Sequence, residues 1–493
     1  MELTVPQALL LSFLIFLLLS ALLFPNPFAL LIPSNSFSTQ PFLHKPAGDA
    51  PCLDPLKVYV VDLAREFNYG LLEDYYKSRK ARGSRDLWLG EEPHDGDPLE
   101  EKLDGSSELG EFMPYPKNPN WRQYSAEYWL LADLLTEEPL RAAHSAAVKV
   151  SDMADADVFL VPFFCALSAE IQLGEGHGKF RKKMEENRDY VRQRKVMEFV
   201  TQTSAWRRSG GRDHVFMLTD PMAMWHVRAE IARSILLVVD FGGWYMEDAK
   251  AGEKAKVYGD GMPSNVIAHT DVSLTKDVIV PYTHLLPTLS LAESSPRDVL
   301  LYFRGARHRH RTGLVREKLW TVLGNEPGVI LEEGFPNSTG REEALRGMRR
   351  SHFCLNPAGD TPTSSRLFDS IANLCIPVIV SDTVELPFEG ILNYSTFAVF
   401  VSVNDAMSPG TLVQQLRNMN TTTRSTMRER LRDVQRHFEY ENGHPGGRGS
   451  TVKDGAVQLI WRMVKEKVPG LKATITREHR KFPGSISPRC LCT

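Results

Sequence analysis

The chain contains 493 residues, of which 42% are hydrophobic and 24% charged, and this composition excludes collagen-like and intrinsically disordered proteins. Six cysteines are too few for a fold held together mainly by disulfides. The 58 lysines and arginines nearly balance 61 acidic residues, and a net charge of -3 argues against a dedicated nucleic-acid binder. We therefore expect a folded protein of about three domains with no nucleic-acid partner.

The N-terminus has the pattern of a membrane anchor. Residues 8–24 carry no charge, and as a helix they span about 26 Å, close to a thin membrane core. Pro25 and Pro27 end this run. We expect a signal-anchor transmembrane helix that follows a short cytosolic tail (residues 1–7) and precedes a stem (residues 25–56). A cleaved signal peptide is the alternative.

Both alternatives place the remaining chain in the secretory lumen. Three N-glycosylation sequons agree with that compartment, and they begin at Asn337, Asn393 and Asn420. We expect a single-pass type II membrane protein whose large body is lumenal.

The first half of the body alternates strands and helices. We expect strands at 57–62, 158–164, 214–218, 235–239 and 277–282, and helices at 124–135, 180–205 and 222–234. Residues 78–112 are charged and rich in glycine, which predicts a surface insertion. The alternation predicts an N-terminal α/β domain over residues 57–290.

A second alternation follows. We expect strands at 299–303, 328–331, 352–355 and 376–380, and helices at 312–323, 342–350, 365–374 and 453–468. This predicts a second α/β domain over residues 291–450 and a C-terminal helix and tail over 451–493. Two Rossmann-like domains would face each other across a cleft, because open α/β sheets bind ligands beyond the carboxyl ends of their strands.

A strongly basic loop lies between a predicted strand and a predicted helix. It contains Arg304, Arg307 and Arg311 within the sequence RGARHRHR. Guanidinium groups beside a helix N-terminus favour a diphosphate. A solvated basic loop or a nucleic-acid patch are the alternatives, and the predicted lumenal location weakens the second.

The segment NPAGDTPTSSR also joins a predicted strand to a predicted helix. Gly359 would let the backbone approach a ligand, and Thr361 and Ser364 offer hydroxyl groups. Arg366 lies on the first helical turn, where a cation opposes the helix dipole unless an anion is bound there. Asp369 lies one turn later, placed to accept hydrogen bonds from a ribose. Ordinary capping of a buried helix is the alternative.

These residues belong to a longer stretch with a family resemblance. The sequence FCLNPAGDTPTSSRLFDSIANLCIPVIVSDTVELPFE, residues 353–389, resembles the signature of the exostosin-like glycosyltransferases of family 47, and most closely their plant branch of arabinan arabinosyltransferase-like proteins. The segments ADADVFLVPFF, GRDHVFMLTDP, VVDFG, KDVIVPY and LLYFRG are similar to the family in the same order. The resemblance covers about residues 57–470.

The resemblance implies a GT-B type fold, a Golgi membrane anchor and a UDP-sugar donor. It implies that the domain over residues 57–290 lies on the acceptor side and that the domain over 291–450 binds the nucleotide sugar. It implies transfer with inversion onto a wall or matrix polysaccharide, with no metal or other cofactor. By the same resemblance, Arg304, Arg307 and Arg311 would hold the diphosphate, Asp369 the ribose, and Glu385 would lie near the donor sugar.

Inversion requires one base that removes a proton from the acceptor hydroxyl. Asp220 and Asp240 each follow a predicted strand of the acceptor-side domain, and His284 follows another. We prefer Asp240, because the glycines after it allow close approach. For each aspartate, a helix cap is the alternative.

Other signals give weaker expectations. Asp155 and Asp157 have the spacing of a metal-binding pair, but they precede a buried strand, and we predict no metal site. Trp225, Trp244 and Tyr245 could stack on sugar rings, although core packing explains Trp225 equally well.

The cysteines are expected to divide into two groups. Cys165, Cys354 and Cys375 lie in apolar segments and are predicted to be inert buried thiols. Cys52 could form a disulfide with Cys490 or Cys492, if the tail returns to the first domain.

The leading hypothesis is an inverting glycosyltransferase of the Golgi that moves a pentose such as arabinose from a UDP-sugar to a pectic or related wall polysaccharide. The alternative is a non-catalytic scaffold subunit of a synthase complex, and association with itself or with other glycosyltransferases is open. A secreted hydrolase fits poorly, because it would need paired cleft carboxylates and no diphosphate loop.

Overall fold

The structure is a computed structural model, and it describes most of the body of the chain. The described residues are 54–82, 113–137, 140–141, 145–175, 179–240, 272–290, 296–308, 314–334, 337–359, 361–382, 384–441, 447, 449 and 451–481.

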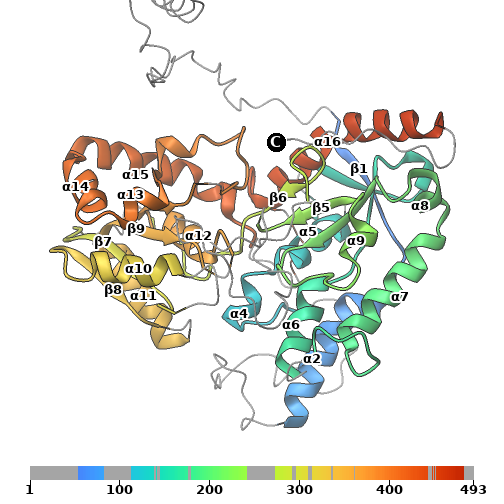
Figure 1. The fold of residues 1–493 in the computed structure, drawn as a ribbon. Helices are drawn as coiled ribbons and strands as arrows, with labels where there is room; N and C mark the ends of the chain where they lie inside the picture. Colours follow the sequence, from blue (N-terminus) through green and yellow to red (C-terminus); the bar gives the residue numbers. More distant parts are fainter. Residues whose placement is uncertain are drawn as a thin grey trace, which may run out of the picture. The chain divides into compact units, whose positions relative to one another are not determined.

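The N-terminal lobe is built on a parallel six-stranded sheet (Figure 1). Its strands are β1 (Leu56–Val60), β2 (Ala147–Val150), β3 (Val158–Leu160), β4 (His214–Leu218), β5 (Ile235–Val238) and β6 (Val278–Ile279), in the order β2-β1-β3-β4-β5-β6. Every residue of β3, β4 and β5 is buried. Parallel strands covered by helices on both faces require such continuous apolar runs.

The helices of this lobe differ in part from the expectation. They are α2 (Tyr69–Arg82), α4 (Pro119–Arg122), α5 (Ala126–Leu135), α6 (Cys165–Glu175), α7 (Arg188–Gln202), α8 (Ser204–Ser209) and α9 (Arg228–Ile231). The helix predicted at 222–234 is only the short α9, because Arg228 donates to the carbonyl oxygens of Pro221 and Ala223 and holds the preceding residues in turns. The first residues of the predicted surface insertion, 78–82, are the end of α2, and residues 83–112 lie outside the described residues.

The C-terminal lobe is built on a parallel five-stranded sheet. Its strands are β7 (Val299–Arg304), β8 (Val329–Glu332), β9 (Ser351–Pro357), β10 (Ile376–Val380) and β11 (Val399–Val401), in the order β11-β10-β9-β7-β8. Its helices are α10 (Leu314–Leu323), α11 (Ser338–Arg350), α12 (Ser365–Ala372), α13 (Val403–Met407), α14 (Thr411–Asn418) and α15 (Thr421–Gln435). The predicted α/β class with two parallel sheets is confirmed.

The C-terminal lobe contains a disulfide that the sequence analysis missed. Cys354 of β9 and Cys375, one residue before β10, are joined, and both are buried. The prediction of two inert thiols is therefore wrong, because neighbouring parallel strands bring their Cα atoms to 5.7 Å, within bridging distance. Cys165 is a free, buried thiol as expected.

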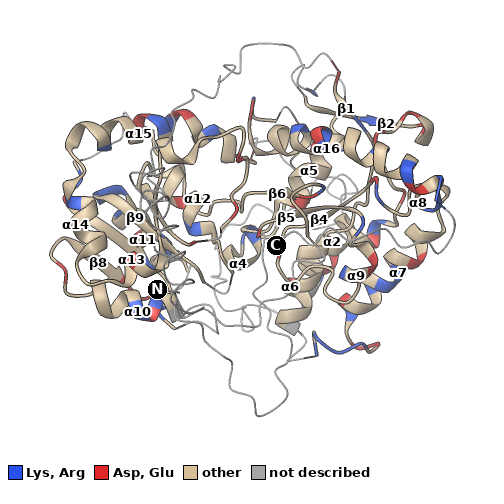
Figure 2. Cartoon of the chain, turned by 45° about the horizontal axis from the view of Figure 1, so that its top comes forward, with Lys and Arg blue, Asp and Glu red and all other residues tan. Residues whose placement is uncertain are grey.

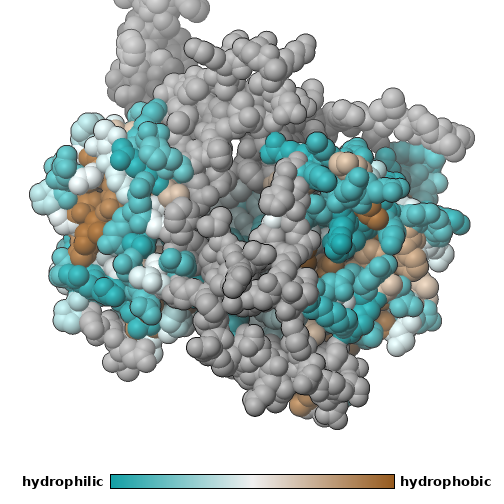
Figure 3. Space-filling model, turned by 90° about the horizontal axis from the view of Figure 1, so that it is seen from below, coloured by the Kyte–Doolittle hydropathy of each residue, from teal (hydrophilic) through white to brown (hydrophobic). Residues whose placement is uncertain are grey.

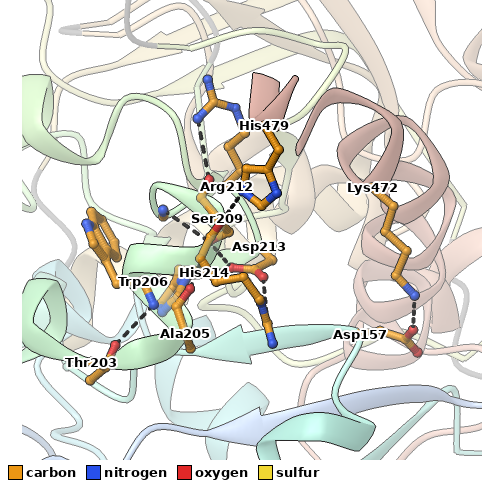
Figure 4. Close-up of polar contacts among 12 residues, drawn as sticks. Asp157, Thr203, Ala205, Trp206, Ser209, Arg212, Asp213, His214, Lys472 and His479 are labelled. Carbon is orange, nitrogen blue, oxygen red and sulfur yellow. Dashed lines mark hydrogen bonds and ion pairs between the residues drawn. The ribbon is translucent and has the colours of Figure 1, made fainter. Parts of the chain in front are cut away.

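The long helix α16 (Ala456–His479) returns to the N-terminal lobe, where it packs on α5 and on strands β1, β2 and β6. Figure 4 shows its polar attachments: Lys472 forms an ion pair with Asp157 at 2.7 Å, and His479 hydrogen-bonds the carbonyl oxygen of Arg208 at 2.7 Å. The chain therefore crosses between the lobes a second time after leaving the C-terminal lobe.

Among the described residues, no helix is both long and apolar enough to cross a membrane. The predicted anchor and most of the predicted stem lie outside them, as do Cys52, Cys490 and Cys492.

Candidate functional site

The carboxyl ends of the two sheets meet at Asp240, which follows β5. One carboxylate oxygen of Asp240 accepts hydrogen bonds from the backbone N–H and the hydroxyl of Thr363, at 2.8 and 2.6 Å. Its other oxygen accepts one from the hydroxyl of Tyr282 at 2.5 Å. Thr363 lies in the loop between β9 and α12, so this contact joins the predicted acceptor side to the predicted donor loop.

Burial raises the pKa of Asp240, and the hydrogen bonds from Thr363 and Tyr282 partly oppose that rise. A raised pKa suits a general base, but three donors already engage the carboxylate. Its role as the base stays a prediction, and its contact between the lobes is a second role that the sequence did not indicate.

The segment that leads from β6 into the C-terminal lobe forms hydrogen bonds with residues of that lobe. Asp369 of α12 accepts hydrogen bonds from the backbone N–H groups of Leu285 and Leu286, at 2.7 and 2.9 Å. One carboxylate oxygen of the predicted ribose-binding side chain therefore accepts both hydrogen bonds from the connection between the lobes. Contact between Asp369 and a ribose stays a prediction.

His284 belongs to the same connection. Its Nε2 lies 3.0 Å from a carboxylate oxygen of Glu439, and its Nδ1 lies 2.8 Å from the carbonyl oxygen of Leu286. Burial alone would lower the pKa of His284, but the hydrogen bond and charge of Glu439 raise that pKa to about 9. The pair is thus charged at neutral pH, and His284 is a poor proton acceptor there.

We expect His284→Gln to destabilise the fold by roughly 2 kcal/mol near neutral pH, because it leaves Glu439 half-buried without its charged partner. A folded-state pKa of about 9 lies above the ordinary value of 6.5, so the stabilisation is complete below pH 6.5 and is lost as the pH rises through 9. Urea unfolding of wild type and variant across this range measures the difference. A difference that stays constant up to strongly alkaline pH would contradict the charged pair.

Two arginine side chains lie over the ring of Phe303, near the carboxyl ends of β7 and β9. Arg316 on the first turn of α10 and Arg366 on the first turn of α12 lie 5.4 and 5.0 Å from the ring centre of Phe303. The Nε of Arg316 donates to the carbonyl oxygen of Ala358, and the Nε of Arg366 donates to that of Arg304. The guanidinium of Arg316 therefore holds the loop that follows β9, and the guanidinium of Arg366 holds the end of β7. Both groups lie near the N-termini of α10 and α12, and helix N-termini favour a bound anion.

The glycines of these loops leave room for the arginines. A Cβ on Gly359 would lie 2.5 Å from a guanidinium nitrogen of Arg316, and one on Gly305 would lie 2.6 Å from a guanidinium nitrogen of Arg366. The sequence predicts that Gly359 leaves room for a ligand, whereas in the structure the space beside its Cα holds the guanidinium of Arg316.

The predicted diphosphate arginines do not gather at one point. Arg304 forms ion pairs with Glu332 and Glu343, bordering a hollow of about 480 Å³ between β8 and α11. These two carboxylates would compete with a diphosphate for the guanidinium of Arg304. Diphosphate binding by Arg304 stays a prediction. The Nε of Arg307 is buried and has no hydrogen-bond partner among the described residues, while Arg311 lies outside them.

The remaining predicted donor-site residues line the loops beyond β9 and β10. Thr361 is buried and donates to the carbonyl oxygen of Thr363, and Ser364 accepts a hydrogen bond from Arg366. Glu385 is half-buried and hydrogen-bonds Glu389, where burial first and the charge of Glu385 next raise the pKa of Glu389.

Asp220 lies at the carboxyl end of β4 in a carboxyl pair. It is buried, accepts a hydrogen bond from the backbone N–H of Met222, and shares another with the side chain of Glu170. Burial first, and then the charge of Asp220, raise the pKa of Glu170, so the pair holds a proton. The residues after Asp220 form turns and α9 begins only at Arg228, so Asp220 caps a turn rather than a helix, and its role as a base stays a prediction.

Sequence reasoning missed Arg316 and Glu170. Arg316 occurs in an ordinary amphipathic segment, LVREKL, yet the dipole argument that selected Arg366 applies to it equally. Glu170 carries no local signal, because its partner Asp220 lies fifty residues away in the chain.

The other predicted positions have plain surroundings. The side chains of the three sequon asparagines are exposed and accept hydrogen bonds from backbone N–H groups two or three residues later, and glycosylation stays a prediction; they are Asn337, Asn393 and Asn420. Asp157 pairs with Lys472 rather than with Asp155. Trp225 is half-buried, and Trp244 and Tyr245 lie outside the described residues.

Comparison with known proteins identifies the relatives of the chain. A family model described as the exostosin GT47 domain matches residues 52–416. A protein of Arabidopsis thaliana named "Probable arabinosyltransferase ARAD1" is 34% identical over 90% of this chain and 86% of its own length. A rice protein named "Probable glucuronosyltransferase GUT1" is 25% identical over 55% of this chain and 61% of its own length. The solved structure of TarM is 8% identical over 56% of this chain and 57% of its own, with a TM-score of 0.28.

Proposed function

Because the chain belongs to the exostosin GT47 family of glycosyltransferases, we propose that it transfers a pentose such as arabinose from a UDP-sugar to a cell-wall polysaccharide. The observation that carries the donor half of this proposal is the crossed pair of arginines, Arg316 and Arg366, at the carboxyl ends of β7 and β9. The names of the relatives support arabinosyl transfer first and glucuronosyl transfer second.

The two arginines suit the leaving group of this reaction. When the bond between the sugar and UDP breaks, the diphosphate gains negative charge. Guanidinium groups and the N-termini of α10 and α12 stabilise that charge in place, without rearrangement. We therefore propose an inverting reaction that needs no metal and no other cofactor, in a fold of the GT-B type.

Asp240 is the proposed base. It is half-buried and touches Thr363 in the donor loop, so an acceptor hydroxyl beside it would face the donor sugar. The proton of that hydroxyl would pass to the carboxylate as the oxygen attacks the anomeric carbon from the face opposite UDP.

We expect Asp240→Asn to keep UDP affinity and to lower transfer by at least about a hundredfold, the scale of a general base. The matched variant Tyr282→Phe removes one hydrogen bond to the same carboxylate but leaves the carboxylate itself in place. Turnover and UDP affinity of both variants separate the roles. Equal, modest losses in the two variants would assign Asp240 to positioning of the donor loop.

The location is proposed as the Golgi lumen, with the chain held by its N-terminal anchor. The Cys354–Cys375 disulfide supports an oxidising compartment, where such bonds persist. The exposed sequons support the same compartment, because each would be reachable by the glycosylation machinery.

The direct test is calorimetric titration of the purified full-length chain with UDP, with and without EDTA. Binding that is unchanged by EDTA, followed by release of UDP from UDP-arabinose only when a pectic oligosaccharide is present, would support the proposal. Absence of UDP binding by a folded chain would favour the alternative of a scaffold subunit in a synthase complex.

A further inference from the structure

The described surface offers charge rather than apolar area for recognition. Figure 3 shows hydrophilic residues over most of the described surface seen from below, with small hydrophobic patches. A cluster of lysine and arginine side chains lies in the N-terminal lobe, in the loop between α6 and α7 and on the first residue of α7 (Figure 2). We define the basic loop as residues 179–188.

The backbone of the basic loop is fixed from within. The side-chain amide of Asn187, which is fully buried, donates to the carbonyl oxygens of Lys179, Phe180 and Lys182, at 3.3, 2.6 and 2.9 Å. The Nε2 of His226 lies 2.9 Å from the carbonyl oxygen of Phe180, whose ring is buried. Because the carbonyl groups are used on the inside, the loop is held in one conformation.

The charged side chains of the basic loop lie on the outside. The exposed residues are Lys179, Arg181, Lys182, Lys183 and Arg188, together with Glu185 and Glu186.

The lysines of the basic loop lack the ion pairs found on the helix that follows. Lys182 and Lys183 are within ion-pair distance of no carboxylate among the described residues. On α7, by contrast, Arg194 pairs with Glu230 at 2.6 Å. The loop has five cationic and two acidic side chains, and this net charge of +3 on a rigid backbone favours a polyanion.

An aromatic side chain completes the surface on the side of the predicted acceptor site. The guanidinium carbon of Arg181 lies 5.8 Å from the ring centre of Trp225. Trp225 belongs to the turns that follow the carboxyl end of β4, one residue from His226, which bonds the basic loop. Aromatic rings bind the apolar faces of sugars, so the combination suits a charged glycan better than a phosphate or a lipid surface.

We propose that the basic loop and Trp225 bind a glycan that carries carboxylate groups, and hold a uronic-acid-containing acceptor on the N-terminal lobe. The inference rests on the proposed function, because it names the chemical class of the acceptor. Lysine and arginine would contact the carboxylates, and Trp225 a sugar ring between them.

The test measures binding of a fluorescein-labelled oligogalacturonide to the purified full-length chain by fluorescence anisotropy, at low and at physiological salt. We expect salt-dependent binding that weakens by about tenfold or more in Lys182→Glu/Lys183→Glu. Trp225→Ala should weaken binding without changing its dependence on salt. A neutral arabinan oligosaccharide should not compete at equal concentration.

The matched control is Arg430→Glu/Arg432→Glu, which changes the net charge equally on exposed residues of α15 in the other lobe. An equal loss in the control, no binding by the wild type, or binding of phosphatidylserine vesicles in place of the oligogalacturonide would overturn the inference. UDP affinity measured on the same preparations separates this outcome from a failure of the proposed function, which would abolish UDP binding whether or not the glycan binds.

Discussion

Arg366→Ala is expected to weaken UDP binding by about a hundredfold, because a guanidinium that contacts a diphosphate contributes roughly 2 to 3 kcal/mol through charge-assisted hydrogen bonds. Arg316→Ala should have a similar effect, since both guanidinium groups lie within 5.4 Å of the centre of the Phe303 ring. Isothermal titration with UDP measures both. The control is Arg417→Ala, which removes an exposed arginine paired with Glu326 at 3.6 Å.

Gly359→Ala tests the same geometry without removing a charge. The new Cβ would lie 2.5 Å from Arg316, which is buried and cannot move freely, so UDP affinity should fall while the arginine remains present. Gly470→Ala is the matched control, because a Cβ at that position meets nothing within 4 Å. Unchanged UDP affinity in Gly359→Ala and Arg366→Ala would place the diphosphate elsewhere.

Cys354→Ser/Cys375→Ser is expected to lower the free energy of unfolding by about 3 kcal/mol, the value for a cross-link that closes a loop of this length. The two residues are 21 positions apart. Urea unfolding of the oxidised wild type, the reduced wild type and the double variant measures the loss.

The reductant is the internal control for this prediction. Dithiothreitol should destabilise the wild type more than the double variant, because only the wild type loses the Cys354–Cys375 bond, whereas a bridge from Cys52 would be lost from both. Quantitative alkylation of both cysteines in the unreduced, unfolded wild type would contradict the disulfide.

The alternation of short apolar strands with amphipathic helices predicted two α/β units and the inner strands of both sheets, but it missed the edge strands β2 and β11. β4, β5 and β10 were located to within one residue, because a strand buried on both faces is apolar throughout. The helix after β4 was not located correctly, because Arg228 donates hydrogen bonds to backbone carbonyl groups and holds the residues before α9 in turns.

Partners across the fold were beyond sequence reasoning. Asp240 and Thr363 are 123 positions apart, and His284 and Glu439 are 155 apart. Asp240 and His284, both candidate bases in the sequence analysis, also bond residues of the other lobe, and only the structure shows those contacts.

The sequence by itself determined the α/β class, the strand–loop–helix segments that carry Arg304 and Arg366, and the family. Each of these depends on residues that are neighbours in the chain, where periodicity and motif spacing act. Only the tertiary structure decided that Arg316 joins Arg366, that Cys354 bonds Cys375, and that Arg304 turns toward two glutamates. These outcomes depend on which strand ends become neighbours in space, and the hydrogen bonds and ion pairs formed there decide which charges remain available to a ligand.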